Sequence, residues 1–430
     1  MTVFSMKFTN TTRKKTFQKL SLLTLLTLSL FLGSSCQMLV TPIAGNFDGD
    51  PKELKENLDK EDIKNIDEAF KSLEGKCPVD FHVHAVGIGA NNSGLWVNPK
   101  MSSFFNFKEY IKYNVYMNAS GITDVENADQ QYMDRLAEQV TSEKRIGKIL
   151  LFAFDYHYKL DGSRDKENST FYVPNQYVYD MAKKYPEQMI PAISIHPYRK
   201  DAVERLEFWA KKGVKFIKWL PNSMHIDPAR KEIIPFYKMM AKYDMALISH
   251  TGHEKAVEGE EFQELGNPLR LKLALDHGAK IVMSHLASLG ECSDFDNQYK
   301  PVFCFDLFWR LMKTGKYKGQ LYGEISATTL HTRLGKPLLD LLEHPEYHSY
   351  FINGSDYPLP AINLLYRTSQ YLKEGYITKS QEKTLNKVYK YNPLLFNFLT
   401  KRMLSHPKTK AKLSDQIFTG SDLFSCNQKL

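Results

Sequence analysis

The chain has 430 residues, of which 43% are hydrophobic and 25% charged, so it can bury a large core and is not a disordered protein. Its formal net charge is +8, but five positive charges and no negative ones lie in the first 35 residues, which leaves +3 for the remainder. No long basic stretch is interleaved with aromatic residues, so the composition offers no case for nucleic-acid binding.

The first 35 residues have the charge order of a secretory signal peptide, a basic segment followed by an apolar run over 20–33. That run is about 14 residues long, short of the roughly 20 that a membrane-spanning helix needs. The residues Leu32-Gly33-Ser34-Ser35-Cys36 resemble the lipobox of bacterial lipoproteins, although the aliphatic residue stands four places before the cysteine rather than three. The resemblance implies an acylated Cys36, a lipid bilayer as partner and a location in the bacterial cell envelope. Ordinary cleavage with Cys36 as a plain thiol stays open.

Residues 36–75 are expected to be the lipid anchor and a charged spacer that ends in one amphipathic helix over 61–73. The expected role of this spacer is to hold the following domain away from the membrane.

From residue 76 to 404, short apolar runs alternate with longer amphipathic segments, which is typical of βα units over a parallel sheet. Eight runs predict strands: 79–83, 149–154, 190–195, 214–220, 245–249, 281–284, 321–325 and 350–353. Eight is the number of strands in a closed (β/α)8 TIM barrel, so we expect one α/β catalytic domain of that class. The predicted helices are 129–143, 175–184, 202–212, 228–242, 268–276, 303–314, 337–342, 362–373 and 379–403.

Two segments break this alternation, 87–120 after the first strand and 155–173 after the second. We expect them to be long loops that cover the mouth of the barrel. Residues 405–430 are predicted to be a polar, partly unstructured tail. A disulfide between Cys292 and Cys304 and isolated buried thiols are both open.

The first strand carries the sequence Asp80-Phe81-His82-Val83-His84. Residues i and i+2 of a strand point to the same side, so His82 and His84 are expected to face the barrel interior together. Two converging neutral imidazoles suit zinc or another borderline divalent ion.

Ligand-type residues also end other predicted strands: His250 ends the fifth, His285 the sixth, and Asp356 follows the eighth within Asn353-Gly354-Ser355-Asp356. The carboxyl ends of all barrel strands meet at one mouth. Because the chain has only 13 histidines, chance placement is a poor explanation for this pattern.

With these motifs the sequence resembles the amidohydrolase superfamily, in particular the branch that contains aminocarboxymuconate semialdehyde decarboxylase, over about 79–399. The resemblance implies one divalent ion, with zinc expected, held by His82, His84, His250 and Asp356. It assigns proton transfer to Asp356, and carbonyl polarisation and proton handling to His285. A second ion is expected only if Lys218 is carbamylated; an unmodified Lys218 would bind a substrate carboxylate or form an ion pair.

His196 and Glu324 end the third and seventh predicted strands, where they would contact substrate or support the ligands. Asp155 and His157 are weaker candidates, because they open a long polar and aromatic loop whose course the sequence does not specify. His225, His253 and Glu254 lie just beyond strand ends, where a solvated loop position is the simpler interpretation.

The leading functional hypothesis is hydrolysis of a C–N or C–O bond, in an amide, lactone or ester, of a small organic substrate. The alternative is non-oxidative decarboxylation of an unsaturated or aromatic carboxylate, for which Lys218 or Arg199 would supply a cationic clamp. A third hypothesis, a non-catalytic surface-binding lipoprotein, gives no reason for a full set of ligands at the strand ends. The sequence specifies neither the substrate nor the oligomeric state.

Overall fold

The computed structural model describes residue 45, residues 49–257 and residues 259–424. The predicted signal peptide and Cys36 therefore lie outside the described residues. Within the described part of the chain, no helix combines the length and apolar character that crossing a membrane requires.

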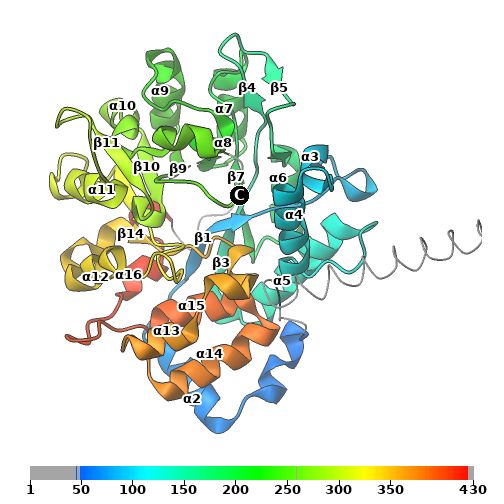
Figure 1. Cartoon of the computed structure of the whole chain (residues 1–430), viewed down its shortest axis with the longest axis vertical. Helices are drawn as coiled ribbons and strands as arrows, with labels where there is room; N and C mark the ends of the chain where they lie inside the picture. Colours follow the sequence, from blue (N-terminus) through cyan, green and yellow to red (C-terminus); the bar gives the residue numbers. More distant parts are fainter. Residues whose placement is uncertain (1–44, 46–48, 258, 425–430) are drawn as a thin grey trace, which may run out of the picture.

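Eight parallel strands form one sheet in the order β1-β3-β7-β8-β9-β10-β13-β14. Backbone hydrogen bonds join the two edges: the Phe81 amide donates to the Asn353 carbonyl (2.9 Å) and the Asp356 amide to the His82 carbonyl (2.8 Å). The sheet therefore closes into the predicted TIM barrel (Figure 1). Each predicted strand is present with its ends shifted by at most two residues: β1 (Val79–His84), β3 (Lys148–Phe152), β7 (Met189–Ile193), β8 (Phe216–Trp219), β9 (Ala246–His250), β10 (Lys280–Ser284), β13 (Leu321–Glu324) and β14 (Phe351–Ile352).

An irregularity in β1 sets the direction of its side chains. The pairing of β1 with β3 shifts register between Asp80 and Val83. Phe81 belongs to the apolar cluster inside the barrel, and the adjacent His82 ring also faces inward, 4.9 Å from the Phe152 ring of that cluster. In a regular strand, two adjacent side chains point to opposite faces of the sheet. The bulge therefore allows the apolar Phe81 and the polar His82 both to point into the barrel.

Helices surround the barrel: α5 (Ala128–Ser142), α6 (Asn175–Lys184), α7 (Ala202–Lys211), α8 (Pro221–Met224), α9 (Ile234–Lys242), α10 (Lys272–Asp276), α11 (Cys304–Lys313), α12 (Lys336–Glu343), α13 (Thr368–Lys373), α14 (Lys379–Tyr391) and α15 (Pro393–Met403). The predicted helix 379–403 is two helices, because Pro393 cannot continue α14. Asn392 instead accepts a hydrogen bond from the Leu395 amide and caps α15.

The segment expected to be a spacer is, from residue 49 on, part of the domain. Its helix α2 (Lys60–Phe70) buries Ile66 and Phe70, and the Phe70 ring stacks on Phe398 of α15 at 5.1 Å. The spacer interpretation is wrong for these residues, because the apolar face of the helix packs on the C-terminal helices α14 and α15.

The expected polar tail is also wrong for residues 405–424. A short helix, α16 (Asp415–Phe418), buries Ile417 and Phe418, and the Ile417 carbonyl accepts from the Asn353 amide of the barrel (2.8 Å). Phe424 reaches the apolar cluster inside the barrel, 6.4 Å from the Phe81 ring. The segment thus covers the end of the barrel opposite the strand carboxyl termini.

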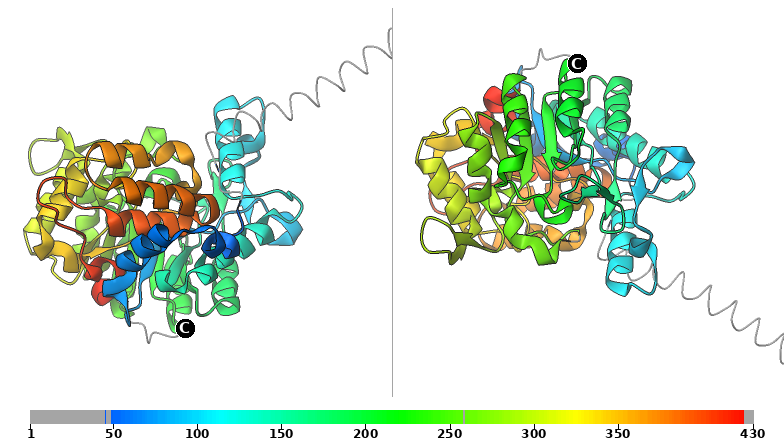
Figure 2. Two further views of the ribbon diagram at one scale, coloured as in Figure 1. Left: turned by 90° about the horizontal axis from the view of Figure 1, so that it is seen from below. Right: turned by 90° about the horizontal axis from the view of Figure 1, so that it is seen from above.

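The two predicted mouth loops contain secondary structure of their own. Residues 87–120 form β2 (Trp96–Val97), α3 (Pro99–Ser102) and α4 (Phe107–Ala119), whereas 155–173 form β4 (His157–Tyr158), β5 (Arg164–Asp165) and β6 (Phe171–Tyr172). Strand β2 pairs with β6, which joins the two loops. Figure 2 shows α3 and α4, in cyan, standing out from one side of the barrel.

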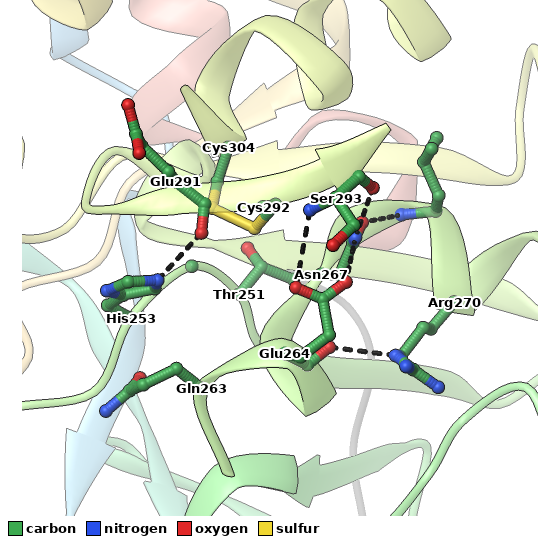
Figure 3. The surroundings of a disulfide bond; sticks show 12 residues. Thr251, His253, Gln263, Glu264, Asn267, Arg270, Glu291, Cys292, Ser293 and Cys304 are labelled. Atoms are coloured by element: carbon green, nitrogen blue, oxygen red, sulfur yellow. Dashed lines mark hydrogen bonds between the residues drawn. A yellow bond between two sulfur atoms is a disulfide. The ribbon is translucent and has the colours of Figure 1, made fainter. Parts of the chain in front are cut away.

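A disulfide bond links Cys292 to Cys304 at the base of the hairpin β11 (Glu291–Asp294) and β12 (Lys300–Phe303) (Figure 3). The isolated-thiol alternative is therefore wrong for this pair, and Cys77 is also disulfide-bonded. The side-chain Nδ2 of Asn267 donates a hydrogen bond to the Ser293 carbonyl (2.8 Å), which links this hairpin to the loop that follows β9.

Candidate metal centre

Three ligand-type side chains from the first and last strands of the barrel meet at its mouth. The Nε2 atoms of His82 and His84 are 3.2 Å apart, and Oδ1 of Asp356 lies 3.3 Å from the first and 3.2 Å from the second. The closing hydrogen bonds of the barrel hold them together, because the Asp356 amide binds the His82 carbonyl.

Glycine is required at position 354 for this approach. A Cβ atom added at Gly354 would stand 2.7 Å from Cβ of His82, closer than side chains tolerate. The buried Lys401 of α15 fixes the same turn by donating hydrogen bonds to the Gly354 carbonyl and to Oδ1 of Asn353. The position of Asp356 thus depends on a helix distant in sequence.

Glu324 and Ser326 set the protonation of two histidines. Oε2 of Glu324 accepts from Nδ1 of His82 (2.8 Å) and from the Ser326 hydroxyl (2.7 Å). Because that hydroxyl donates to the carboxylate, it accepts from Nδ1 of His285 (2.7 Å). Both rings therefore carry their proton on Nδ1 and present an unprotonated Nε2 to the mouth, which is the tautomer that binds a metal.

His250 lies beside His285, outside the group formed by His82, His84 and Asp356. Its ring lies 4.9 Å from that of His285, and its Nδ1 is 3.3 Å from Glu254. Among the described residues, His250 is not in a group of three or more ligand atoms within 4.8 Å of one another, but its buried Nε2 has no hydrogen-bond partner. The expected four-ligand set is thus brought together in three of its members, with an orphaned nitrogen on the fourth.

His285 lines the same cavity, with Nε2 3.9 Å from Oδ2 of Asp356. Lys218 lies at the floor, where its Nζ is 3.1 Å from Nε2 of His82 and 4.8 Å from the centre of the Phe152 ring. Burial lowers the pKa of Lys218 to about 8, although Asp356 and Glu324 act in the other direction.

Burial keeps His84, His250 and His285 neutral, whereas the neighbours of Asp356 keep that carboxylate ionised. It lowers the pKa of both His84 and His250 to about 4, and that of His285 well below the ordinary value. Burial alone would raise the pKa of Asp356, but the neighbouring His82 and His285 hold it well below the usual range. At neutral pH these side chains therefore present imidazole lone pairs and the negative charge of Asp356, beside the Lys218 ammonium group.

The cavity above these groups measures about 160 Å³. Its wall is mostly apolar and comes from the loops after β1, β3, β8 and β9; it includes Ile88, Met101, Tyr116, Phe171, Leu220 and Val257. Lys218 is the one lysine or arginine among the described residues that line it.

Several predicted site residues lie elsewhere. His196 does not line the cavity, because its Nε2 binds the Met224 carbonyl (2.8 Å) and its Nδ1 accepts from the Tyr198 amide (3.2 Å). Arg199 pairs with Asp201 (2.8 Å) and Asp155 (3.5 Å), away from the cavity wall. The expectation that His196 and Arg199 contact substrate is therefore not met by their positions.

The weaker candidates divide in the same way. His253 binds the Glu291 carbonyl through Nε2 (2.8 Å) in the disulfide region (Figure 3), and His157 and His225 contact each other at 4.3 Å outside the cavity wall. Glu254, in contrast, is buried, lines the cavity and orients His250, so a solvated loop position is wrong for it.

The sequence interpretation missed Ser326, Lys401 and the cavity-lining tyrosines of α4. Ser326 comes two residues after Glu324, the spacing that places both at one strand end, and this was the available signal. Nothing in the sequence pattern marks Lys401, because it acts across 47 residues on the Gly354 turn.

No protein-family model matches the chain, and no curated protein matches its sequence. Solved structures with a similar barrel include an uncharacterized TIM-barrel protein from Bordetella bronchiseptica, with 14% identity, coverage of 73% of this chain and 95% of that chain, and a TM-score of 0.45. The 5-carboxyvanillate decarboxylase of Novosphingobium aromaticivorans, bound to manganese, shows 10% identity, 75% and 97% coverage, and a TM-score of 0.41. The 4-oxalomesaconate hydratase of Rhodopseudomonas palustris shows 13% identity, 73% and 95% coverage, and 0.38. Similarity at this level carries no argument about activity.

Proposed function

We propose that the chain is a metal-dependent hydrolase of the amidohydrolase type that acts on a C–N or C–O bond of a small, uncharged organic substrate. The observation that carries this proposal is the meeting of His82, His84 and Asp356, whose ligand atoms lie within 4.8 Å of one another. These residues come from opposite ends of the barrel sequence.

The donor set fits a divalent cation. Nε2 of His82 lies 3.3 Å from Oδ1 of Asp356, and Nε2 of His84 lies 3.2 Å from each of them, so two imidazole nitrogens and one carboxylate oxygen converge where one cation would contact all three. The Nε2 atom of His250 is buried and has no hydrogen-bond partner. A bound metal ion would compensate the loss of hydration at this nitrogen. Imidazole and carboxylate ligands suit zinc, and they also suit manganese or iron.

A divalent ion held by these side chains would lower the pKa of a bound water to about 7. Asp356, which is ionised, would accept the proton of the attacking water and return it to the leaving group. His285, with its unprotonated Nε2 at 3.9 Å from Asp356, is a second proton acceptor rather than a donor to the substrate carbonyl.

The wall of the cavity favours an uncharged substrate. A substrate carboxylate would have Lys218 as its cation, and that amine already lies 3.1 Å from His82 at the floor. Transfer of any second charge into the apolar wall would cost several kcal/mol without a partner.

The test is an assay of metal-replete protein on panels of neutral amides, lactones and esters, each paired with an analogue that carries an added carboxylate. We expect turnover that a chelator abolishes, and a kcat/KM at least about 10-fold higher for the neutral member, since one unpaired charge costs more than 1.4 kcal/mol. Inactivity on every panel at full metal occupancy would contradict the proposal.

Decarboxylation of an unsaturated or aromatic carboxylate is the second candidate, favoured by the position of Lys218 at the cavity floor. Release of carbon dioxide from such acids, lost in Lys218→Met and retained in the surface variant Lys242→Met, would favour it. A carbamylated Lys218 would instead bind a second ion. Mass spectrometry of the intact protein detects the carbamyl group as the added mass of one carbon dioxide.

We also propose that the mature chain is a lipoprotein of the bacterial cell envelope, anchored through Cys36. The support is the order of basic, apolar and small residues before Cys36 in the sequence. Metabolic labelling with palmitate should mark the wild type and not Cys36→Ala; equal labelling of both would reject the anchor.

A further inference from the structure

The helical segment α3–α4 ends in an exposed apolar surface that nothing in the described chain covers. Phe104, Phe105 and Phe107 are 68%, 100% and 62% exposed, and Ile111 is 40% exposed. We call these four residues the aromatic tip. The Phe104 ring contacts the rings of Phe107 and Tyr110, whereas Phe105 is fully exposed, so the protein gains little packing from the aromatic tip. Large apolar groups gathered in this way mark a binding surface rather than scattered surface residues.

The flanks of the aromatic tip are basic. Residues 99–112 hold three lysines and one glutamate. The side chains of Lys100 and Lys108 are 58% and 61% exposed, and each forms a surface ion pair, with Glu167 and Glu260. Ion pairs between exposed side chains contribute little to stability, so they oppose contact with an anionic surface only weakly. Aromatic side chains bordered by lysines are the composition that membrane interfaces prefer.

The first described residue of the chain, Gly45, lies beside α4. A Cβ atom added there would stand 2.9 Å from the Asn118 carbonyl. Eight residues lie between Cys36 and Gly45, and the nine Cα–Cα steps that join the two can span at most about 30 Å. The 13 residues of α4 measure about 20 Å, so a bilayer that holds Cys36 is within reach of the aromatic tip.

We propose that the aromatic tip inserts into the interface of a lipid bilayer and fixes the orientation of the barrel on the membrane. The apolar rings enter the acyl boundary, while the lysines remain among anionic headgroups. Together with an anchor at Cys36, this gives two points of attachment: the aromatic tip at the start of α4, and the preceding chain, whose Gly45 lies at the end of α4.

This orientation bears on access to the active-site cavity. The other face of α4 supplies Tyr113, Tyr116 and Met117 to the cavity wall, and α3 supplies Met101. The segment that enters the membrane is therefore also the cover of the cavity. An apolar substrate dissolved in the bilayer would meet the protein at the edge of its own binding site.

The test uses the full chain reconstituted in vesicles of phosphatidylethanolamine and phosphatidylglycerol with brominated acyl chains, which quench nearby tryptophan. Phe105→Trp places a reporter on the aromatic tip. Phe208→Trp is the matched control, because Phe208 is a phenylalanine of α7 that is 51% exposed and lies outside the aromatic tip. Trp209, Trp219 and Trp309 are buried and Trp96 is half-buried, so the emission of the wild-type chain in the same vesicles is subtracted from that of each variant.

We expect the added emission of Phe105→Trp to fall at least twofold in brominated vesicles, and that of Phe208→Trp to stay unchanged. Phe107→Trp should repeat the result. Equal emission of Phe105→Trp in brominated and plain vesicles overturns the insertion, even while the chain stays vesicle-bound through Cys36. A chain that separates from vesicles on flotation overturns both insertion and anchor. Blue-shifted Phe105→Trp emission without lipid, together with dimers in sedimentation, overturns it in favour of a second copy of the chain.

Discussion

Oε2 of Glu324 lies 2.8 Å from Nδ1 of His82, and both side chains are buried. The carboxylate accepts the Nδ1 proton and so directs the unprotonated Nε2 to the mouth. Glu324→Gln removes the charge that favours this tautomer, and we expect the metal affinity to fall about 10- to 100-fold. Titration of apo protein with zinc against a competing chelator measures the change.

Glu343 provides a matched control, because it accepts from Nε2 of His406 (3.0 Å) in a pair outside the cavity wall. Glu343→Gln should leave the metal affinity within about twofold. If both variants bind zinc as the wild type does, the role assigned to Glu324 is wrong.

Replacement of a ligand should remove the ion without unfolding the barrel. In Asp356→Ala and His82→Ala we expect less than about one tenth of the wild-type metal content, because structural metal sites lose affinity steeply with each ligand. Elemental analysis gives the metal content and circular dichroism the fold. Unfolding of both variants would instead indicate that these residues act mainly in barrel closure.

Stability of the metal-free protein should decrease in mild acid. Burial lowers the pKa of His84, His225 and His250 to about 4 and that of His196 to about 3. Between pH 6.5 and 4 the unfolded chain therefore binds more protons than the folded one, and the free energy of unfolding decreases as the pH falls.

Two carboxyls oppose this trend, since burial raises the pKa of Asp80 and Asp155. The four histidines outweigh these two carboxyls, because each pKa unit corresponds to about 1.4 kcal/mol. We expect the free energy of unfolding to fall by about 2 kcal/mol or more between pH 6.5 and pH 5. Urea unfolding at the two pH values measures it. An unchanged or higher stability at pH 5 would contradict the assignment of neutral, buried histidines.

The Cys292–Cys304 disulfide should stabilise the fold by restricting the unfolded chain. It closes a loop of 12 residues, for which chain entropy gives about 3 kcal/mol. Cys292→Ala with Cys304→Ala should lower the free energy of unfolding by about 2–3 kcal/mol and leave the metal content unchanged, because the hairpin lies outside the cavity wall. Loss of metal in this variant would show that the hairpin supports the ligands.

The strands were predictable because each is a short apolar run with a near-constant spacing from the next, and burial of both faces of a parallel sheet demands such runs. Helix α4 was not predictable in the same way. Its tyrosines and Met117 face a cavity while Phe107 and Ile111 face outward, so it lacks the single apolar face that marks a helix packed on a core.

The site was predictable where its residues end strands. His82, His84 and Asp356 follow from strand positions alone, because all carboxyl ends share one mouth. His196 also follows a strand end, since β7 ends at Ile193, yet its ring nitrogens bind the Met224 carbonyl and the Tyr198 amide. Strand position places a side chain near the mouth; local hydrogen bonds decide whether it faces the cavity.

By itself, the sequence determined the barrel and the residue types at its mouth, since both follow from local patterns of apolar and ligand-forming residues. Only the tertiary structure decided that His82, His84 and Asp356 meet within 4.8 Å, that Lys401 fixes the Gly354 turn, and that residues 49–75 and 405–424 pack on the barrel. The physical reason is that these contacts join segments far apart in the chain, and their geometry is set by closure and packing rather than by local spacing.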